Sequence, residues 1–209
     1  MTNKPTKEQE NHQRTVEDGA AVDMDMKKKR MTLQSVTRML DRAGVDYVVG
    51  GSGMLLGLGL VDDVRDWDLM TDAPEAEVQA ALAGMKWTKD SGTSELYGSG
   101  CKLRIEGTEP EVEIIIGFAV RANADFCRMP ALMDGIRDGL RVASPEVWMA
   151  AYELMGRHEK SALLERYLHE HGANYRALSD LRKEPLPKEL AERLSRLPEA
   201  SPDLAKKMK

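Results

Sequence analysis

The chain has 209 residues, of which 42% are hydrophobic and 31% are charged, and its formal net charge is -5. These proportions are typical of a globular protein that is long enough for one good-sized domain with an appendage. The longest apolar run, Gly53 to Val61, is too short to cross a membrane, and the negative charge argues against a surface built throughout to bind nucleic acid.

The N-terminal segment, residues 1–30, is predicted to be a disordered tail because it is polar and lacks apolar periodicity. We interpret its one basic run, Lys27 to Arg30, as solvated chain rather than a phosphate-binding arm or a localisation signal. Removing residues 1–30 is therefore expected to leave the fold unchanged. The segment has no apolar stretch that could serve as a secretory signal, so we expect a cytoplasmic protein.

The folded part is expected to begin with a helix near Thr32, because apolar residues recur there at helical spacing and Gly44 can close the helix. A short β-prone run, Val45 to Val49, ends at the pair Gly50-Gly51. The next expected elements are a short helix or turn at 54–60, a strand at 65–70, a helix ending at 84, and strands at 85–89, 101–105 and 111–118.

After about residue 124 the pattern becomes helical, with helices predicted at 145–155, 159–171 and 187–197. Strands and helices in this order predict an α+β protein. We expect a core domain over residues 31–124 and a helical C-terminal region over residues 125–209.

Two acids interrupt the predicted strand at 65–70. Side chains two residues apart on a strand share a face, so Asp66 and Asp68 project together while Trp67 points the other way. Adjacent carboxylates repel one another unless a cation lies between them. Mg²⁺ is the natural candidate because it prefers oxygen ligands and is usually bound by one or two carboxylates together with substrate phosphates.

A third carboxylate can come from the strand at 111–118, on which Glu111 and Glu113 share one face. If this strand pairs beside the strand of Asp66 and Asp68, three carboxylates converge. Such a cluster predicts a site for two metal ions.

The order of these motifs resembles the polymerase-β-type nucleotidyltransferase superfamily. The resemblance covers roughly residues 32–118 and is carried by Val49-Gly50-Gly51-Ser52, by Asp66-Trp67-Asp68-Leu69, and by Val112-Glu113-Ile114. It implies a mixed sheet flanked by helices, a bound nucleoside triphosphate such as ATP, and Mg²⁺ ions held by the acids. The segment VASPEVWMAAYELMGRHEKSALLERYL is similar to the helical tail of the branch that includes antibiotic and abortive-infection toxin nucleotidyltransferases.

Two positions depart from that branch. Its Arg-x-x-Lys-Asp segment corresponds here to Arg157-His158-Glu159-Lys160-Ser161, with Ser161 in place of the acid. The third catalytic acid is commonly Asp, whereas this chain has Glu113.

The resemblance also implies roles for individual residues. Asp66 and Asp68 would bind both metal ions, and Glu113 would hold the ion that lowers the pKa of the attacking hydroxyl. The β- and γ-phosphates would lie on Gly50, Gly51 and Ser52. Triphosphate charge would be balanced by Arg65, Lys102 and Arg104, although Lys102 and Arg104 are equally compatible with an ordinary solvent-facing strand.

Other patterns have structural interpretations that we prefer. A dinucleotide-binding turn competes for the glycines, but Leu56 occupies the position of its last glycine. His169 and His171 point in different directions on a helix, so they are expected to be surface residues. The pair Trp148 and Tyr152 is expected to pack in the core, and the cysteines Cys101 and Cys127 to be buried or half-buried thiols.

The sequence thus predicts a Mg²⁺-dependent nucleotidyltransferase that moves a nucleoside monophosphate to an acceptor hydroxyl with release of pyrophosphate. The acceptor can be a small molecule, a tRNA or a protein. The alternative is a catalytically degenerate protein of the same fold that binds nucleotide or a partner protein.

Overall fold

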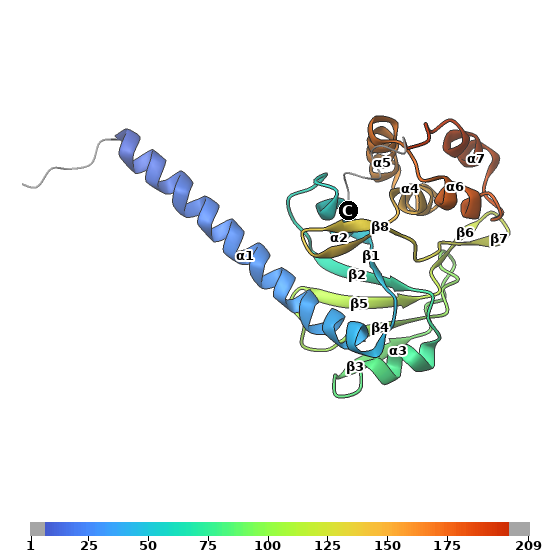
Figure 1. The fold of residues 1–209 in the computed structure, drawn as a ribbon, viewed down its shortest axis with the longest axis horizontal. Coiled ribbons are helices and arrows are strands. Elements are labelled where there is room, and N and C mark those ends of the chain that lie inside the picture. Colours follow the sequence, from blue (N-terminus) through green and yellow to red (C-terminus); the bar gives the residue numbers. More distant parts are fainter. Residues whose placement is uncertain (1–6, 201–209) are drawn as a thin grey trace, which may run out of the picture.

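A seven-stranded mixed sheet, in the order β3-β4-β5-β2-β1-β9-β8, forms the centre of the protein (Figure 1). The computed structural model describes the backbone of residues 7–200 and the side chains of residues 24–200. The sheet strands are β1 (Val48–Val49), β2 (Asp66–Thr71), β3 (Trp87–Asp90), β4 (Cys101–Ile105), β5 (Glu111–Ile116), β8 (Met133–Arg137) and β9 (Leu140–Ala143). A separate hairpin consists of β6 (Ala119–Ala122) and β7 (Asp125–Arg128).

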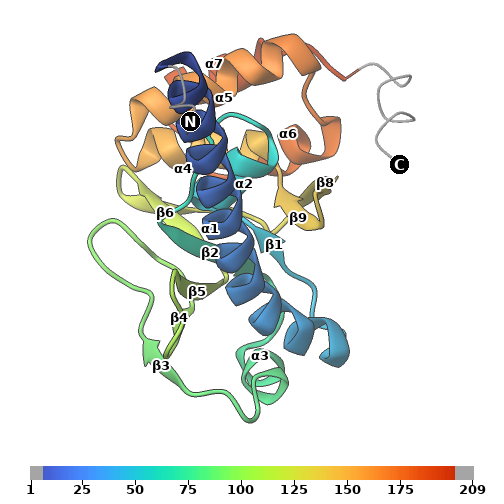
Figure 2. The same cartoon turned by 90° about the vertical axis from the view of Figure 1, so that its left-hand side faces the viewer.

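Helices lie on both sides of this sheet. They are α1 (Lys7–Ala43), α2 (Gly51–Gly57), α3 (Glu75–Ala81), α4 (Pro145–Leu154), α5 (His158–His171), α6 (Tyr175–Leu181) and α7 (Lys188–Ser195). Figure 2 shows α1 crossing in front of the sheet and the C-terminal helices gathered beyond one end of it. The predicted α+β class, with a mixed sheet flanked by helices and a helical C-terminal region, is confirmed.

The two central strands, β2 and β5, run parallel and pair residue by residue. Asp66 lies opposite Glu111, and Asp68 lies opposite Glu113. Trp67 and Leu69 are fully buried, whereas Asp66 is exposed and Asp68 half-buried. The alternation expected from the sequence therefore holds, and it places the acids of both strands on one face of the sheet.

Helix α1 covers the opposite face, and it is much longer than expected. It begins at Lys7 instead of near Thr32, because the chain from Lys7 to Ala43 contains no proline and a single glycine. The indole of Trp67 donates a hydrogen bond to the carbonyl oxygen of Lys29 at 3.1 Å, and Lys29 Nζ lies 2.6 Å from Asp63. Lys29 thus belongs to the folded part, which corrects the boundary at residue 30. Residues 1–6 of the expected tail lie outside the described residues.

The segment from residue 125 to residue 143 is not helical, contrary to expectation. It forms β7, β8 and β9, and β9 pairs in parallel with β1 through Val142 and Val49. A two-residue turn with positive φ at Asp138 (49°) and Gly139 (77°) joins β8 to β9, which is the geometry that favours a hairpin. The sheet of the core therefore includes strands on both sides of residue 124, and the helical region begins only at Pro145.

Helix α4 is the centre of the C-terminal region. Every residue from Pro145 to Tyr152 is buried, because α4 contacts β6 of the hairpin and the three helices that follow it. Helix α6 was not expected. None of the helices in the described part of the chain combines the length and the apolar composition that a membrane crossing requires.

Candidate active site

A cavity of about 450 Å³ opens on the acid-bearing face of the sheet, between β2, α2 and the start of α5. All three expected acids line it, together with Gly51, Ser52 and four cationic side chains. The lining also includes apolar and aromatic side chains on one side. The cavity is therefore the place where the motifs singled out in the sequence meet.

Asp66 and Asp68 have no ion-pair partner among the residues whose side chains are described. Asp66 Oδ1 accepts a hydrogen bond of 3.3 Å from the hydroxyl of Ser52, whereas Asp68 is half-buried. The pKa of Asp68 is raised to about 6, mainly by burial and then by the negative charges of Asp66 and Glu113, which outweigh the lowering by Lys102 and Arg157. The pair is thus electrostatically strained and would be stabilised by a cation.

The glycine pair is required by close contacts on both sides. Gly51 has a φ of +54°, and a Cβ built on it would lie 2.0 Å from Asp68 Oδ2. A Cβ on Gly50 would lie 2.2 Å from the indole of Trp148. Helix α2 starts at Gly51, so the amide groups of its first turn have no intrahelical acceptor.

The same turn excludes the dinucleotide-binding alternative. That motif needs two parallel strands joined by the helix that follows the glycines. Here β1 and β2, the strands on either side of α2, pair antiparallel, with Val48 opposite Met70.

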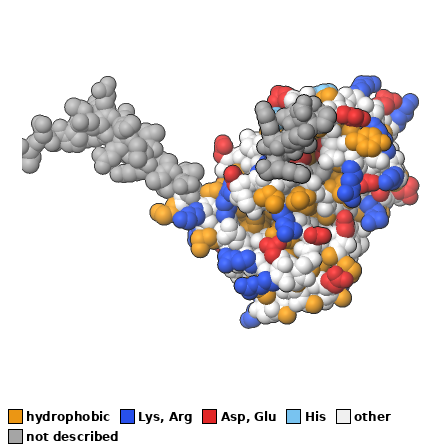
Figure 3. Space-filling view, in the orientation of Figure 1, with side chains coloured by type: hydrophobic (Ala, Val, Ile, Leu, Met, Phe, Trp, Pro, Cys, Tyr) orange, Lys and Arg blue, Asp and Glu red, His pale blue; other side chains and the backbone are white. Residues whose placement is uncertain are grey.

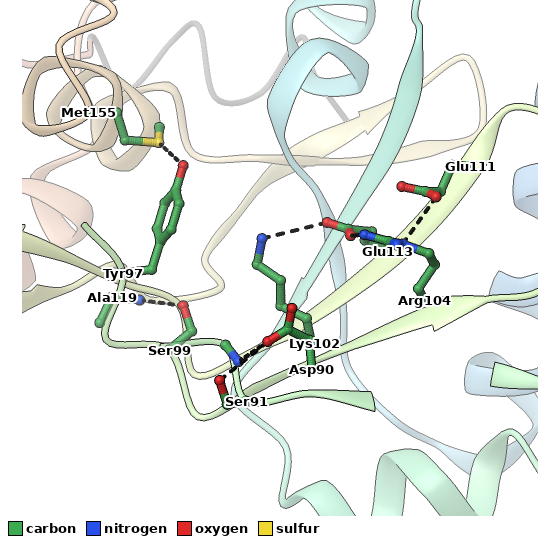
Figure 4. A network of polar contacts seen from close by, with 11 residues as sticks. Asp90, Ser91, Tyr97, Ser99, Lys102, Arg104, Glu111, Glu113, Ala119 and Met155 are labelled. Atoms are coloured by element: carbon green, nitrogen blue, oxygen red, sulfur yellow. Dashed lines mark hydrogen bonds and ion pairs between the residues drawn. The ribbon is translucent and has the colours of Figure 1, made fainter. Parts of the chain in front are cut away.

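Glu113 lines the cavity, but cations hold its carboxylate. Figure 4 shows Lys102 and Arg104 reaching toward it: Arg104 Nη2 donates to Oε1 at 3.0 Å, and Lys102 Nζ lies 3.6 Å from Oε2. Within the described part of the chain, no three Asp, Glu, His or Cys side chains approach closely enough to hold a metal ion together. The three carboxylates therefore share one cavity without forming the expected metal cluster.

The cations expected around the phosphates divide into two groups. Arg65 and Lys102 line the cavity. Arg104 does not, because it lies on the rim, where it bridges Glu111 and Glu113 with contacts of 3.0 Å.

Two further cations, Arg157 and Lys160, line the cavity from the start of α5. Burial lowers the pKa of Lys160, and the positive charges of Arg157 and Arg65 lower it further, so the three cations are close neighbours. The sequence singled out this segment only through the family resemblance. Ser161, which replaces the usual acid, is fully buried and accepts a hydrogen bond from Arg193 at 3.3 Å, away from the cavity.

An aromatic wall bounds the other side of the cavity. Phe118 and Trp148 stack at 5.5 Å between centroids, and Tyr97 lies 6.4 Å from Phe118. Trp148 and Tyr152 are core residues, as expected, but Trp148 also lines the cavity, and its indole nitrogen has no hydrogen-bond partner among the described residues. Tyr97 was missed because it lies in a connecting segment, where neither periodicity nor a motif marks it. Phe118 was expected only as the last residue of the strand at 111–118, and it follows the observed end of β5 at Ile116.

The remaining candidates have structural roles. The ring of His171 stacks on Tyr167 at 4.1 Å and belongs to no metal-binding group among the described side chains, and His169 is exposed. Cys101 and Cys127 are free and buried, as expected. Charges of both signs are interspersed on the face of the molecule seen in Figure 3.

Comparisons with known proteins give two structural neighbours. No family model and no curated protein matches the chain. A protein from Thermotoga maritima, provisionally described as a nucleotidyltransferase, is 24% identical with a TM-score of 0.45, over 66% of this chain and 91% of that one. The antibiotic-resistance factor ANT(2'')-Ia is 15% identical with a TM-score of 0.47, over 79% and 90%. The description of the first neighbour names the class that the sequence motifs resemble.

Proposed function

We propose that the protein is a Mg²⁺-dependent nucleotidyltransferase. The observation that carries this proposal is the charge pattern of one cavity. In it Asp66 and Asp68, which have no ion-pair partner among the described side chains, lie beside four cations, Arg65, Lys102, Arg157 and Lys160. A polyphosphate needs cationic partners, and a metal ion between it and the acids removes their repulsion. The cavity offers both kinds of group on neighbouring walls.

Only part of the expected ligand set fits a metal ion. Asp66 and Asp68 fit, because they share a face of β2, and burial together with the charges of Asp66 and Glu113 raises the pKa of Asp68. Glu113 does not fit as it stands, because Arg104 and Lys102 occupy its carboxylate. The arrangement therefore supports one ion at the acid pair, and the expected second ion would require Glu113 to change partners. A bound ion would neutralise phosphate charge and make the acceptor hydroxyl more acidic.

The other residues of the cavity would bind and orient the triphosphate. Arg157 and Lys160 are suited to the β- and γ-phosphates, where they would neutralise the charge that pyrophosphate gains as it leaves. The first-turn amides of α2, at Gly51 and Ser52, would donate to the same phosphates. The nucleobase would contact the aromatic wall, since a planar ring packs well on stacked aromatic side chains.

In the reaction, the acceptor oxygen forms a bond to the α-phosphorus while the bond from this phosphorus to the bridging oxygen breaks. The acceptor is proposed at the level of its reacting group, a hydroxyl on a small molecule, a tRNA or a protein.

Calorimetry of nucleotide binding tests the proposal. Each of the four ribonucleoside triphosphates is titrated into the protein with Mg²⁺ and again with a chelator, and Lys160→Gln is compared with Lys183→Gln. Lys183 lies outside the cavity, where it pairs with Asp180, so this control removes the same charge elsewhere. We expect binding that requires Mg²⁺ and is weakened by Lys160→Gln alone. Equal affinity with and without Mg²⁺ would refute the metal-dependent reading.

A second candidate function, nucleotide binding without transfer, is favoured by the ion pairs that hold Glu113. Pyrophosphate release in the presence of candidate acceptors distinguishes the two. Release that disappears in Asp68→Asn supports the transferase. Intact Mg²⁺-dependent binding with no release across a broad acceptor screen supports the binder.

A further inference from the structure

Glu113 differs from the other two acids of the cavity because it is already paired. Its neighbour in register, Asp68, has no ion-pair partner among the described side chains, whereas Glu113 contacts Arg104 at 3.0 Å and Lys102 at 3.6 Å. Asp68 and Glu113 lie opposite each other in register on one face of the sheet, so their negative charges repel each other. The ion pairs and this repulsion both favour the arrangement in which Glu113 turns away from the acid pair.

Arg104 reaches Glu113 from outside the cavity. Its side chain is 54% exposed and lines a second cavity of about 370 Å³, which shares Lys102 and Glu113 with the first. Lys102 and Glu113 thus form the boundary between the two cavities, and Arg104 holds the Glu113 side of this boundary (Figure 4).

This inference rests on the function proposed above. We propose that Arg104 is a positioning residue that holds Glu113 away from Asp66 and Asp68 until a metal-bound triphosphate is present. A divalent cation at the acid pair would turn the repulsion of Glu113 into attraction. The contact with Arg104 would then be the main force that opposes the approach of Glu113 to the metal ion. Glu113 and Arg104 would separate as Glu113 moves toward the ion. Arg104 therefore weakens divalent-metal binding, which is the opposite of the phosphate-binding role expected from the sequence.

The test measures metal affinity without turnover. Free Mn²⁺ is counted by electron paramagnetic resonance during titration of the full chain with an α,β-methylene nucleoside triphosphate, which cannot transfer. Arg104→Gln removes the cation that holds Glu113. Lys89→Gln is the matched control, because Lys89 lines the same second cavity but pairs with Glu75 at 2.5 Å. Thermal melts check that each variant is folded.

We expect Arg104→Gln to bind Mn²⁺ roughly twofold to fivefold more tightly, the factor that corresponds to loss of a partly exposed ion pair. Lys89→Gln should leave the affinity unchanged. In a Glu113→Gln background, Arg104→Gln should have no effect, because the carboxylate on which it acts is gone.

Three results would overturn the inference. Unchanged or weaker Mn²⁺ binding in Arg104→Gln would do so while leaving the proposed function intact, and weaker binding would identify Arg104 as a phosphate ligand. An equal gain in the Glu113→Gln background would show that Arg104 acts through its charge or through Glu111. Absence of Mn²⁺ binding in the wild-type protein would refute the proposed function, and this inference with it.

Discussion

Replacing Asp68 with Asn is expected to stabilise the metal-free protein at neutral pH. The pKa of Asp68 rises from its ordinary value of 3.8 to about 6 in the folded state, mainly through burial and then through Asp66 and Glu113. A raised acid pKa means that the folded protein binds the proton more tightly than the unfolded chain. The contribution of Asp68 to the unfolding free energy is therefore most favourable below pH 3.8 and becomes less favourable as the pH rises toward 6. A pKa difference of two units corresponds to about 3 kcal/mol, so the unfolding free energy of Asp68→Asn should exceed that of the wild type by about 1 to 3 kcal/mol at pH 7.

The assay is urea denaturation of wild type and Asp68→Asn in chelator and low salt, at several pH values from 4 to 8. The difference in unfolding free energy between the two proteins should be small near pH 4 and grow through pH 6. The other titrating groups are common to both proteins, so their contributions cancel in this difference. Asp66→Asn is the comparison: Asp66 is exposed, and only part of the raised pKa of Asp68 comes from its charge, so this variant should gain less stability than Asp68→Asn. Mg²⁺ should stabilise the wild type and not Asp68→Asn. A mutant that is less stable at pH 7, or a difference independent of pH, would show that Asp68 serves as a structural ion-pair partner.

Three further predictions concern the surroundings of the acid pair. Glu113→Gln should change stability in the opposite direction to Asp68→Asn and lower the unfolding free energy by up to about 1 kcal/mol in the same assay, because Arg104 and Lys102 lose their contacts with the Glu113 carboxylate. A gain would mean that these contacts do not stabilise the fold. Gly51→Ala should lower the unfolding free energy by about 3 kcal/mol or more, because the new Cβ would meet Asp68 in addition to the strain of positive φ. Gly59→Ala, with the same sign of φ and open space around it, should lower it by only about 1 to 2 kcal/mol. Equal losses in the two variants would argue against the close contact between position 51 and Asp68. Removing residues 1–30 should lower the melting temperature, contrary to the expectation from sequence. The buried indole of Trp67 would lose its hydrogen-bond acceptor on Lys29, at a cost of about 1 to 3 kcal/mol. An unchanged melting temperature would show that this hydrogen bond contributes nothing to stability.

The strands that carry the acids were predictable because their pattern is strict. Each strand begins with charged and apolar side chains in alternation and continues with apolar ones, over Asp66 to Met70 and Glu111 to Ile116. Because alternate side chains of a strand point to the same face, this pattern places the acids of each strand on one face. The pairing of β2 with β5 was a hypothesis that the register confirms. The partners of Glu113 were not predictable, since the sequence does not tell which way a carboxylate turns between a cation and another acid.

The strands β8 and β9 were missed although a local signal was present. Asp138-Gly139 is a dipeptide that favours a two-residue hairpin turn, but the flanking residues are short runs rich in Gly, Asp and Arg. The start of α1 was missed for a different reason. Apolar periodicity marks only the part of a helix that packs on a core, and the part that continues beyond the core, visible in Figure 1, has none to show.

The residue-by-residue pairing of β2 with β5 determines where this chain can change in length. Inserting one residue at the start of either strand would turn every following side chain to the other face. In β2 this would move Asp68 into the core and Leu69 into the cavity, and in β5 it would move Glu113 into the core. Insertions in the connections between elements, at residues 58–65 or 106–110, leave the pairing register of β2 and β5 unchanged. Related sequences that keep this chemistry should therefore vary in length in those two connections and keep six residues in each of the two strands.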